Sequence, residues 1–236
     1  TKLSSADSDY TFALIEQLAK SFKPETRTFI DAGGLCKASN SAVAKQIAIQ
    51  LLKNNIKLDG VIFYDDVTNT KKLLTLNSNK DETIVDLTSD MVKDSDSKGI
   101  YFTYYDQSHS RGADIKQADD AHAVITLSST TTNNDYKQAI MRMRKIVSKI
   151  PGGQSFSTAV PDHLKRQMLI DLVPFKPENS NKNAASIKAE QNQIAKLDAE
   201  NLPDLSGNDI AFCLREKELN DNSNAVSLIQ MEMTSI

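Results

Sequence analysis

The stretch TFIDAGGLCKASNSAVAKQIAIQLLKNNIKLDGVIFY, residues 28–64, decides the fold class. It begins and ends with short runs of β-branched and aromatic residues, Thr28–Asp31 and Gly60–Tyr64, which are typical of buried strands. Between these runs, apolar residues recur at four-residue spacing and predict a helix with one apolar face: Val43, Ile47 and Leu51. A strand, a helix and a second strand in this order predict a βαβ unit of a mostly parallel sheet.

The same alternation continues to about residue 160 and predicts further strands at Lys72–Leu76, Ile100–Tyr105, Ala121–Leu127 and Gln154–Ala159. We therefore expect an α/β fold in which helices flank a mostly parallel sheet, followed by a helical extension. The Pro- and Asn-rich run PFKPENSNKN indicates a boundary. The expected division is an N-terminal helix in residues 1–24, an α/β domain in 25–177 and the helical extension in 178–236.

Composition narrows the classes of protein that fit. The chain has 236 residues and a net charge of −3, with no broad basic face of the kind that holds nucleic acid. Its two cysteines, Cys36 and Cys213, lie outside any metal-ligand spacing, so we expect neither zinc nor a disulfide, and a cytoplasmic location. A signal peptide or membrane span is not expected. Because the chain starts at Thr1 without a methionine, we expect it to be part of a larger protein.

The segment YYDQSHSRGADIK, Tyr104–Lys116, follows an apolar strand and should lie where parallel strands present their carboxyl ends. There, Gly112 would let backbone amides approach a ribose or phosphate. Asp114 could orient a cation-bound water, and Arg111 adds positive charge. A charged loop with a turn glycine and no ligand is the structural alternative.

The helix expected at Asn133–Lys149 carries the second set of candidate residues. Its polar face aligns Gln138, Arg142 and Lys145. An arginine on a rigid helix can neutralise charge that develops on a transferring phosphoryl group. The alternative is an ordinary solvated face of a surface helix.

These two segments resemble the paired motifs of the second RecA-like lobe of superfamily-two helicases. SRGADIK at Ser110–Lys116 is similar to the GRGTDIK element of the SecA preprotein-translocase ATPase, and QAIMRMRK at Gln138–Lys145 resembles the arginine-finger motif QxxGRxxR. In this resemblance Gly112 and Asp114 match the first motif. Gln138 and Arg142 match the glutamine and first arginine of the second motif, and Lys145 stands in the second arginine's place. The lysine keeps the charge but lacks the planar fork of arginine.

A wider resemblance rests on FIDAGGL, SNSAVAKQI, GVIFYDD, YYDQSHSRGADIK and MRMRK, which begin at Phe29, Ser39, Gly60, Tyr104 and Met141. Together they look like a family of very large, poorly characterised proteins with a SecA-like phosphate-binding motif far upstream. The resemblance implies a lobe that supplies an arginine finger and a coupling loop, and that is inactive alone. ATP and Mg²⁺ would bind only with the missing N-terminal ATPase lobe, and no cofactor is expected for this chain by itself. A protein or nucleic-acid polymer could be what the motor moves.

Some members of that family carry the label ubiquitin thioesterase-like, which raises a second hypothesis. Cys36 and His109 each follow a predicted strand, so both could lie at one edge of the sheet, with Asp31 or Asp106 orienting the imidazole. A thiol hydrolase acting on ubiquitin conjugates would use this arrangement. The third hypothesis is a non-catalytic interaction module.

Overall fold

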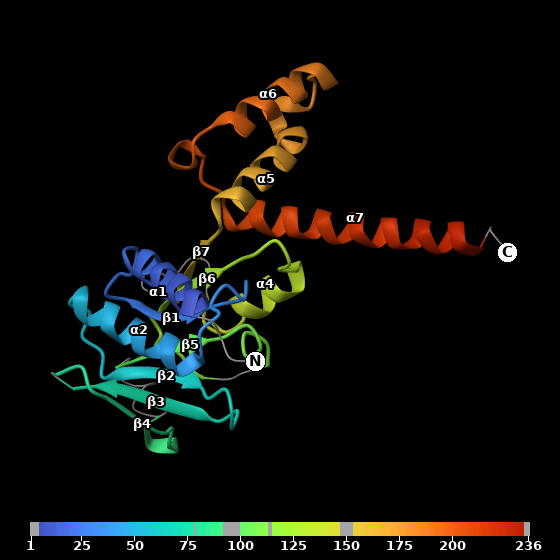
Figure 1. Ribbon diagram of the computed structural model, residues 1–236. Helices are drawn as coiled ribbons and strands as arrows, with labels where there is room; N and C mark the ends of the chain where they lie inside the picture. Colours follow the sequence, from blue (N-terminus) through green and yellow to red (C-terminus); the bar gives the residue numbers. More distant parts are fainter. Residues whose placement is uncertain (1–4, 78, 92–99, 113–114, 147–152, 234–236) are drawn as a thin grey trace. The chain divides into compact units, whose positions relative to one another are not determined.

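The computed structural model describes residues 5–77, 79–91, 100–112, 115–146 and 153–233, with the side chains of the last helix described as far as Asn220. The chain divides into two compact units (Figure 1). The first comprises Thr1–Ser128 with Lys137–Ala159, and the second comprises Ser129–Tyr136 with Val160–Ile236.

A seven-stranded sheet forms the centre of the first unit, in the order β4-β3-β2-β5-β1-β6-β7 among the described residues. Its strands are β1 (Thr26–Ile30), β2 (Gly60–Tyr64), β3 (Lys71–Leu76), β4 (Glu82–Asp86), β5 (Tyr101–Tyr105), β6 (His122–Thr126) and β7 (Ser155–Ala159). Five of them run parallel, and β3 and β4 add an antiparallel edge. The predicted class is confirmed: the fold is α/β with a mostly parallel sheet flanked by helices, consistent with a RecA-like fold.

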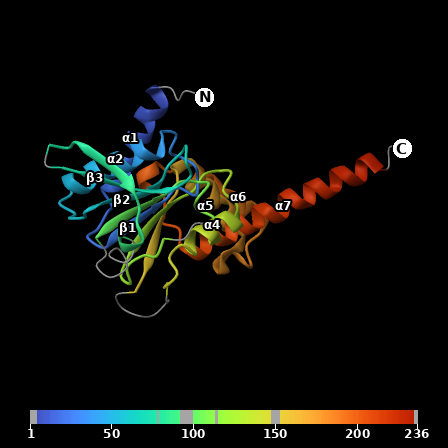
Figure 2. The same ribbon diagram turned by 90° about the horizontal axis from the view of Figure 1, so that it is seen from below.

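Two helices cover one face of this sheet, α1 (Ser5–Ala19) and α2 (Asn40–Lys53), which lie side by side in both ribbon views (Figures 1 and 2). The predicted apolar stripe of α2 is buried in the core against Phe29 and Tyr104, whose rings stack at 5.5 Å. Ile15 of α1 is buried in the same cluster. Burial of these side chains is the main favourable free energy that orders the first unit.

On the opposite face, the described residues 106–112 and 115–121 between β5 and β6 form an irregular segment without a helix. Gln117 anchors this segment because its side chain hydrogen-bonds the Thr28 and Thr103 hydroxyls at 2.7 and 3.1 Å. Thr28 and Thr103 are register partners on β1 and β5. The Tyr105 hydroxyl also donates to the Ile115 carbonyl at 3.0 Å. The segment therefore runs from the carboxyl edge of β5 to the amino edge of β6.

The second unit is helical. Its main elements are α5 (Asp162–Leu172), α6 (Ala184–Lys196) and α7 (Gly207–Met233), joined by short 3-10 helices that include Val173–Phe175 and Pro177–Asn179. A small core joins α5 and α6, with Leu169, Val173 and Ile194 buried. No helix in the described part of the chain combines the length and apolarity that a membrane crossing needs.

Several elements differ from the sequence-based expectation. Helix α4 is Asn133–Ile140, so the predicted helix to Lys149 is too long: residues 141–145 form turns and a bend, and Lys149 lies outside the described residues. The strand β4 was not predicted, because none of its five residues is buried. The run expected to be a linker contains a 3-10 helix, and Asn179 within it is 2 % exposed.

Candidate functional site

The carboxyl ends of β1 and β5 meet at a point where the chain departs in opposite directions. After β1 it passes to α2 on one face, and after β5 it crosses the other face toward β6. The two strands are neighbours, and the Asp31 amide donates to the Tyr105 carbonyl at 2.8 Å. Such a switch point leaves a crevice outside the strand ends, which is where ligands bind in open α/β sheets.

A polar cavity of about 380 Å³ lies at this switch point. Three loops line it: the loop after β1, the turn between β2 and β3, and the start of the crossing segment after β5. Each contributes carboxylates or amides, among them Asp31, Asn40, Asp66, Asn69 and Asp106. The volume is within the range of small-ligand sites, but the lining is polar.

Asp31 fixes the loop after β1. Its side chain is 1 % exposed and accepts hydrogen bonds from the Leu35 and Cys36 amides at 2.9 and 2.8 Å. It also accepts the Thr126 hydroxyl at 2.5 Å, which ties the loop to β6. The Asp31 carboxylate therefore accepts hydrogen bonds from Leu35, Cys36 and Thr126, and among the described residues it is Asp106, not Asp31, that hydrogen-bonds the His109 ring.

Asp106 and His109 form the closest ionisable pair in the cavity. The His109 Nδ1 lies 2.6 Å from Asp106 Oδ2, its Nε2 lies 2.6 Å from Asn69 Oδ1, and its ring stacks on Tyr64 with centroids 3.9 Å apart. Burial raises the pKa of Asp106, but hydrogen bonds from Ser108 and His109 outweigh it, so the net shift is downward. The imidazole is thus held on both nitrogens and one face.

The amino end of α2 also faces the cavity, and a carboxylate already occupies it. Asp66 Oδ2 accepts the Asn40 amide at 2.8 Å, and the Asn40 side chain donates to Asp106 and to the Tyr64 carbonyl at 2.9 Å each. Burial, and then the nearby Asp106 charge, raise the pKa of Asp66. A helix amino terminus that would otherwise attract a phosphate is therefore satisfied from within the chain.

Cys36 lines the same cavity as Asp106 and His109, so the three residues of the thiol-hydrolase hypothesis are brought together. Tyr104 and Asp31 are the side chains that act most strongly on the thiol, and no hydrogen bond joins it to His109 among the described residues. Burial and the Asp31 charge raise the pKa of the Cys36 thiol, which disfavours the nucleophilic thiolate.

Arg142 and Gln138 lie close together after β6, because the Arg142 Nε donates to the Gln138 carbonyl at 3.2 Å. The Arg142 charge also acts on the Tyr105 hydroxyl: burial raises the pKa of Tyr105, and Arg142 opposes that rise. Tyr105 is the last residue of β5. The Arg142 guanidinium therefore lies within electrostatic range of the Tyr105 hydroxyl.

Lys145 contacts residues that precede β6 and β7. Its ammonium pairs with Asp119 at 2.6 Å, and its amide donates to the Gln154 side chain at 2.7 Å. Asp119 and Gln154 precede β6 and β7, so these contacts place Lys145 at the amino edge of the parallel strands. The helical alignment of Lys145 with Gln138 and Arg142 therefore does not hold, because α4 ends at Ile140 and the turn residues that follow bring Lys145 to Asp119.

The predicted loop residues follow His109. Gly112 has a φ of +71°, in the left-handed region, and a Cβ built there would meet no atom within 4 Å. Arg111 beside it is exposed, and Asp114 lies outside the described residues. The positive φ is a conformation that glycine adopts without the strain a side chain would bring.

Within the described ranges, no group of three or more histidine, cysteine, aspartate or glutamate side chains is arranged to hold a metal ion. No family model, curated protein or solved structure matches the chain.

The residues that shape the cavity, above all Asn40, Asp66 and Asn69, were not among the site residues predicted from the sequence. Asn40 and Asp66 stand in the quoted segments SNSAVAKQI and GVIFYDD, each beside the end of a predicted element. Polar residues that follow successive parallel strands were the available signal. Asn69 had a weaker signal, since it lies in a turn with a φ of +56°.

Proposed function

We propose that this chain is the second RecA-like lobe of a helicase- or translocase-type ATPase. In this proposal Arg142 supplies positive charge to a nucleotide that is held mainly by a first lobe outside the chain. The α/β class is consistent with such a lobe. The observation that carries the proposal is that Tyr105, the last residue of β5, hydrogen-bonds the first motif segment through the Ile115 carbonyl and is within electrostatic range of Arg142 in the second. Ligands bind beyond the carboxyl ends of strands in open α/β sheets.

Tyr105 also connects the two motif segments. Its hydroxyl donates to the Ile115 carbonyl in the segment that contains Gly112, and it responds electrostatically to Arg142. A shift of Arg142 toward a nucleotide would change the environment of this hydroxyl and of the backbone that it holds. This contact gives a route by which nucleotide state could reach the Gly112 loop and, through it, a protein or nucleic-acid polymer.

The carboxylates at this edge of the sheet are the reason we expect the chain not to bind ATP strongly by itself. Asp31, Asp66 and Asp106 line the cavity, and Asp66 caps α2 where a phosphate would otherwise bind. The sequence also contains no GxxxxGK[ST] loop. In the proposal, the first lobe provides the phosphate loop and the Mg²⁺ site, and this lobe closes over them.

The experiment is ATP turnover in the protein that contains both lobes. Arg142→Ala should lower kcat by roughly a thousandfold, the effect of removing an arginine finger. Arg144→Ala is the matched control, because Arg144 is an exposed arginine two residues away. Unchanged ATP turnover in Arg142→Ala would contradict the proposal.

A thiol hydrolase is the second candidate function, and one observation favours it: Cys36, His109 and Asp106 line a single cavity. It requires the chain alone to be labelled by a ubiquitin-based electrophilic probe, and Cys36→Ala to abolish labelling while Cys213→Ala does not. The raised pKa of Cys36 weakens this candidate. Absence of labelling would leave the lobe proposal or a non-catalytic interaction module.

A further inference from the structure

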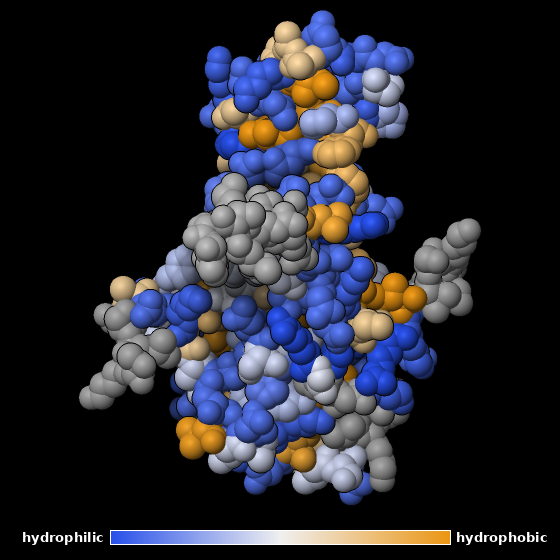
Figure 3. Space-filling model, turned by 90° about the vertical axis from the view of Figure 1, so that its right-hand side faces the viewer, coloured by the Kyte–Doolittle hydropathy of each residue, from blue (hydrophilic) through white to orange (hydrophobic). Residues whose placement is uncertain are grey.

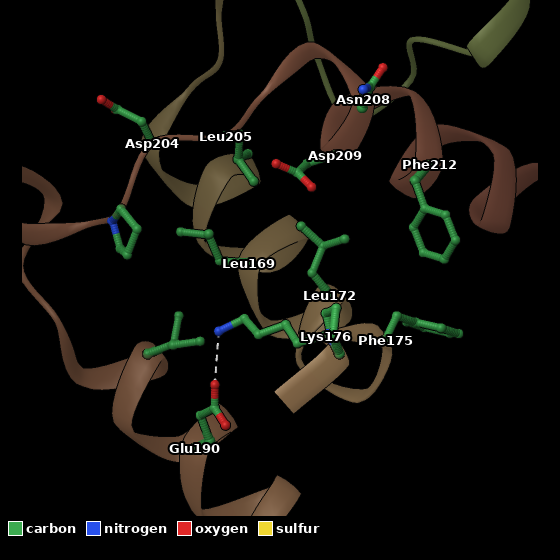
Figure 4. Close-up of a pocket in the computed structure, with 13 residues that line it drawn as sticks. Leu169, Leu172, Phe175, Lys176, Glu190, Asp204, Leu205, Asn208, Asp209 and Phe212 are labelled. Carbon is green, nitrogen blue, oxygen red and sulfur yellow. Dashed lines mark hydrogen bonds and ion pairs between the residues drawn. The ribbon is translucent and has the colours of Figure 1, made fainter. Parts of the chain in front are cut away.

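The helical unit contains an apolar pocket of about 550 Å³ between α5, α6 and the start of α7 (Figure 4). Leu169 and Leu172 of α5, Ile194 of α6 and Phe212 of α7 provide much of its wall. Leu205, in the loop before α7, adds a further apolar side chain. A pocket of this volume with a mostly apolar wall is typical of a site that binds a small molecule.

The apolar surface ends at one side of this pocket. A second hollow of about 370 Å³ shares Phe175 and Phe212 with it, but most of its other lining residues are polar, among them Asp171, Gln191 and Glu216. The Phe175 and Phe212 rings meet edge to face with centroids 4.9 Å apart and mark the boundary. Figure 3 shows hydrophobic side chains of the helical unit in small patches among hydrophilic ones at the top of the view. An extended apolar partner would meet polar side chains beyond the two rings, whereas a compact ligand fits within the first pocket.

Glu190 is a carboxylate in the lining that already has several donors. It pairs with the Lys176 and Lys182 ammonium groups at 2.8 and 3.2 Å, and it accepts the Asn179 side-chain amide at 3.0 Å. In Figure 4 the Lys176 side chain extends along the pocket toward Glu190. The negative charge of Glu190 is therefore matched within the unit.

The other two carboxylates of the lining are engaged as well. Asp204 is fully exposed and pairs with the Lys165 ammonium at 3.0 Å, and Asp209 accepts the Ser206 amide and hydroxyl at 2.9 and 2.6 Å. Positive and negative charges around the pocket balance: Lys165, Lys176 and Lys182 against Glu190, Asp204 and Asp209. An ionic ligand would lose its hydration here without gaining an unmatched charge among the described lining residues.

We propose that this pocket binds a compact, uncharged and largely apolar small molecule. The apolar wall favours removal of apolar ligand surface from water, and the balanced charges disfavour an ion. Lys176 uses one of its three ammonium hydrogens on Glu190, so it can also donate to one oxygen or nitrogen acceptor of the ligand. This site lies in the helical unit and does not depend on the nucleotide proposal.

Two fluorescent probes with the same ring skeleton test the class of ligand. N-phenylnaphthylamine is uncharged and brightens in apolar surroundings, and anilinonaphthalenesulfonate adds a sulfonate. Each is titrated with the whole chain and excited outside the absorption of tryptophan. The uncharged probe should bind saturably at one site, and the sulfonate about tenfold or more weakly, because its charge must be desolvated. Equal or tighter binding of the sulfonate would overturn the assignment to an uncharged ligand.

Leu205→Trp should weaken binding of the uncharged probe by about tenfold or more, because the indole would occupy the space that the ligand needs. Leu205 is half-buried in a loop beside the open pocket, so the larger ring should be accommodated, which a thermal melt checks. Leu219→Trp is the matched control, because Leu219 is 51 % exposed on α7 and lies outside the pocket lining.

Hydrogen exchange of the wild-type chain with and without the uncharged probe locates the site without any variant. Peptides from α5, α6 and the start of α7 should gain protection. If Leu205→Trp does not fold, this pattern decides alone.

Saturable binding that Leu205→Trp weakens and Leu219→Trp leaves unchanged supports the proposal. Absence of binding by the uncharged probe, or protection confined to the α/β unit, would overturn it. Self-association of the wild-type chain in sedimentation, lost in Leu205→Trp, would also contradict it, by assigning the pocket to a second copy of the chain.

Discussion

Removal of the Asp31 carboxylate should loosen the framework of the polar cavity. In Asp31→Ala, the Leu35 and Cys36 amides and the Thr126 hydroxyl each lose their acceptor at this buried position. A hydrogen bond to a charged group contributes about 1.5–3 kcal/mol, so three of them set an upper bound of about 9 kcal/mol. Water entering from the adjacent cavity can replace part of this, and we expect a loss of about 3 kcal/mol.

Asp31→Asn refines this prediction. An amide keeps one oxygen, which can still accept from Leu35 and Thr126, but its NH₂ group faces the Cys36 amide, donor against donor. We expect a loss of about 2 kcal/mol, smaller than that of the alanine variant. Asp59→Ala is the control, because Asp59 is an exposed aspartate in the same unit and its loss should cost under about 0.5 kcal/mol.

The assay is hydrogen exchange followed by mass spectrometry, because a chain of two units need not unfold in one step. Peptides that cover β1, the loop after it and β6 should lose protection in Asp31→Ala. A change in protection equivalent to less than about 0.5 kcal/mol in those peptides, as expected for the control, would refute the role assigned to Asp31.

Three further predictions concern other positions. Gly33→Ala should destabilise the chain by about 2 kcal/mol, because the new Cβ would lie 2.7 Å from the Leu127 backbone. Gly112→Ala should cost about 1 kcal/mol, because of its positive φ alone. Thermal melts of the two variants test this order. The Lys176 ammonium lowers the pKa of Glu190 from 4.5 to about 2. The ionised Glu190 therefore stabilises the folded chain above pH 4.5, and this contribution, about 1 kcal/mol after solvent screening, is lost as the pH falls toward 2. Between pH 4.5 and 2, the urea midpoint of the wild type should fall more steeply than that of Glu190→Gln. Cys36 should react with iodoacetamide more than about tenfold more slowly than glutathione, because its thiol stays protonated. Mass spectrometry measures that rate, and alkylation as fast as that of glutathione would contradict it.

The fold class was predictable because the periodicity of apolar residues reports burial directly. The stripe of α2 and the runs of β1 and β2 are buried as their spacing indicated. Strand β4 carries no such signal: its side chains are exposed, and pairing with β3 through backbone hydrogen bonds defines it. Backbone pairing of an exposed edge leaves little trace in hydrophobic periodicity.

The candidate site was predictable only in part, because helical spacing assumes a continuous helix. Arg142 and Lys145 align on an ideal helix, but α4 ends at Ile140, and the turns that follow carry Lys145 to Asp119. Where the helix ends depends on tertiary contacts, such as the hydrogen bond from the Lys145 amide to the buried Gln154 side chain. The cavity likewise depends on three loops that only the sheet order brings together.

ATP hydrolysis by the protein that carries both lobes tests the central claim most directly, through Arg142→Ala and Lys145→Ala compared side by side. If Arg142 serves a nucleotide at the carboxyl edge, Arg142→Ala should lower kcat roughly a thousandfold. Lys145→Ala should change kcat less than about threefold, because Lys145 is bound to Asp119 at the other edge. Full turnover in Arg142→Ala, or an equal loss in Lys145→Ala, would contradict the account.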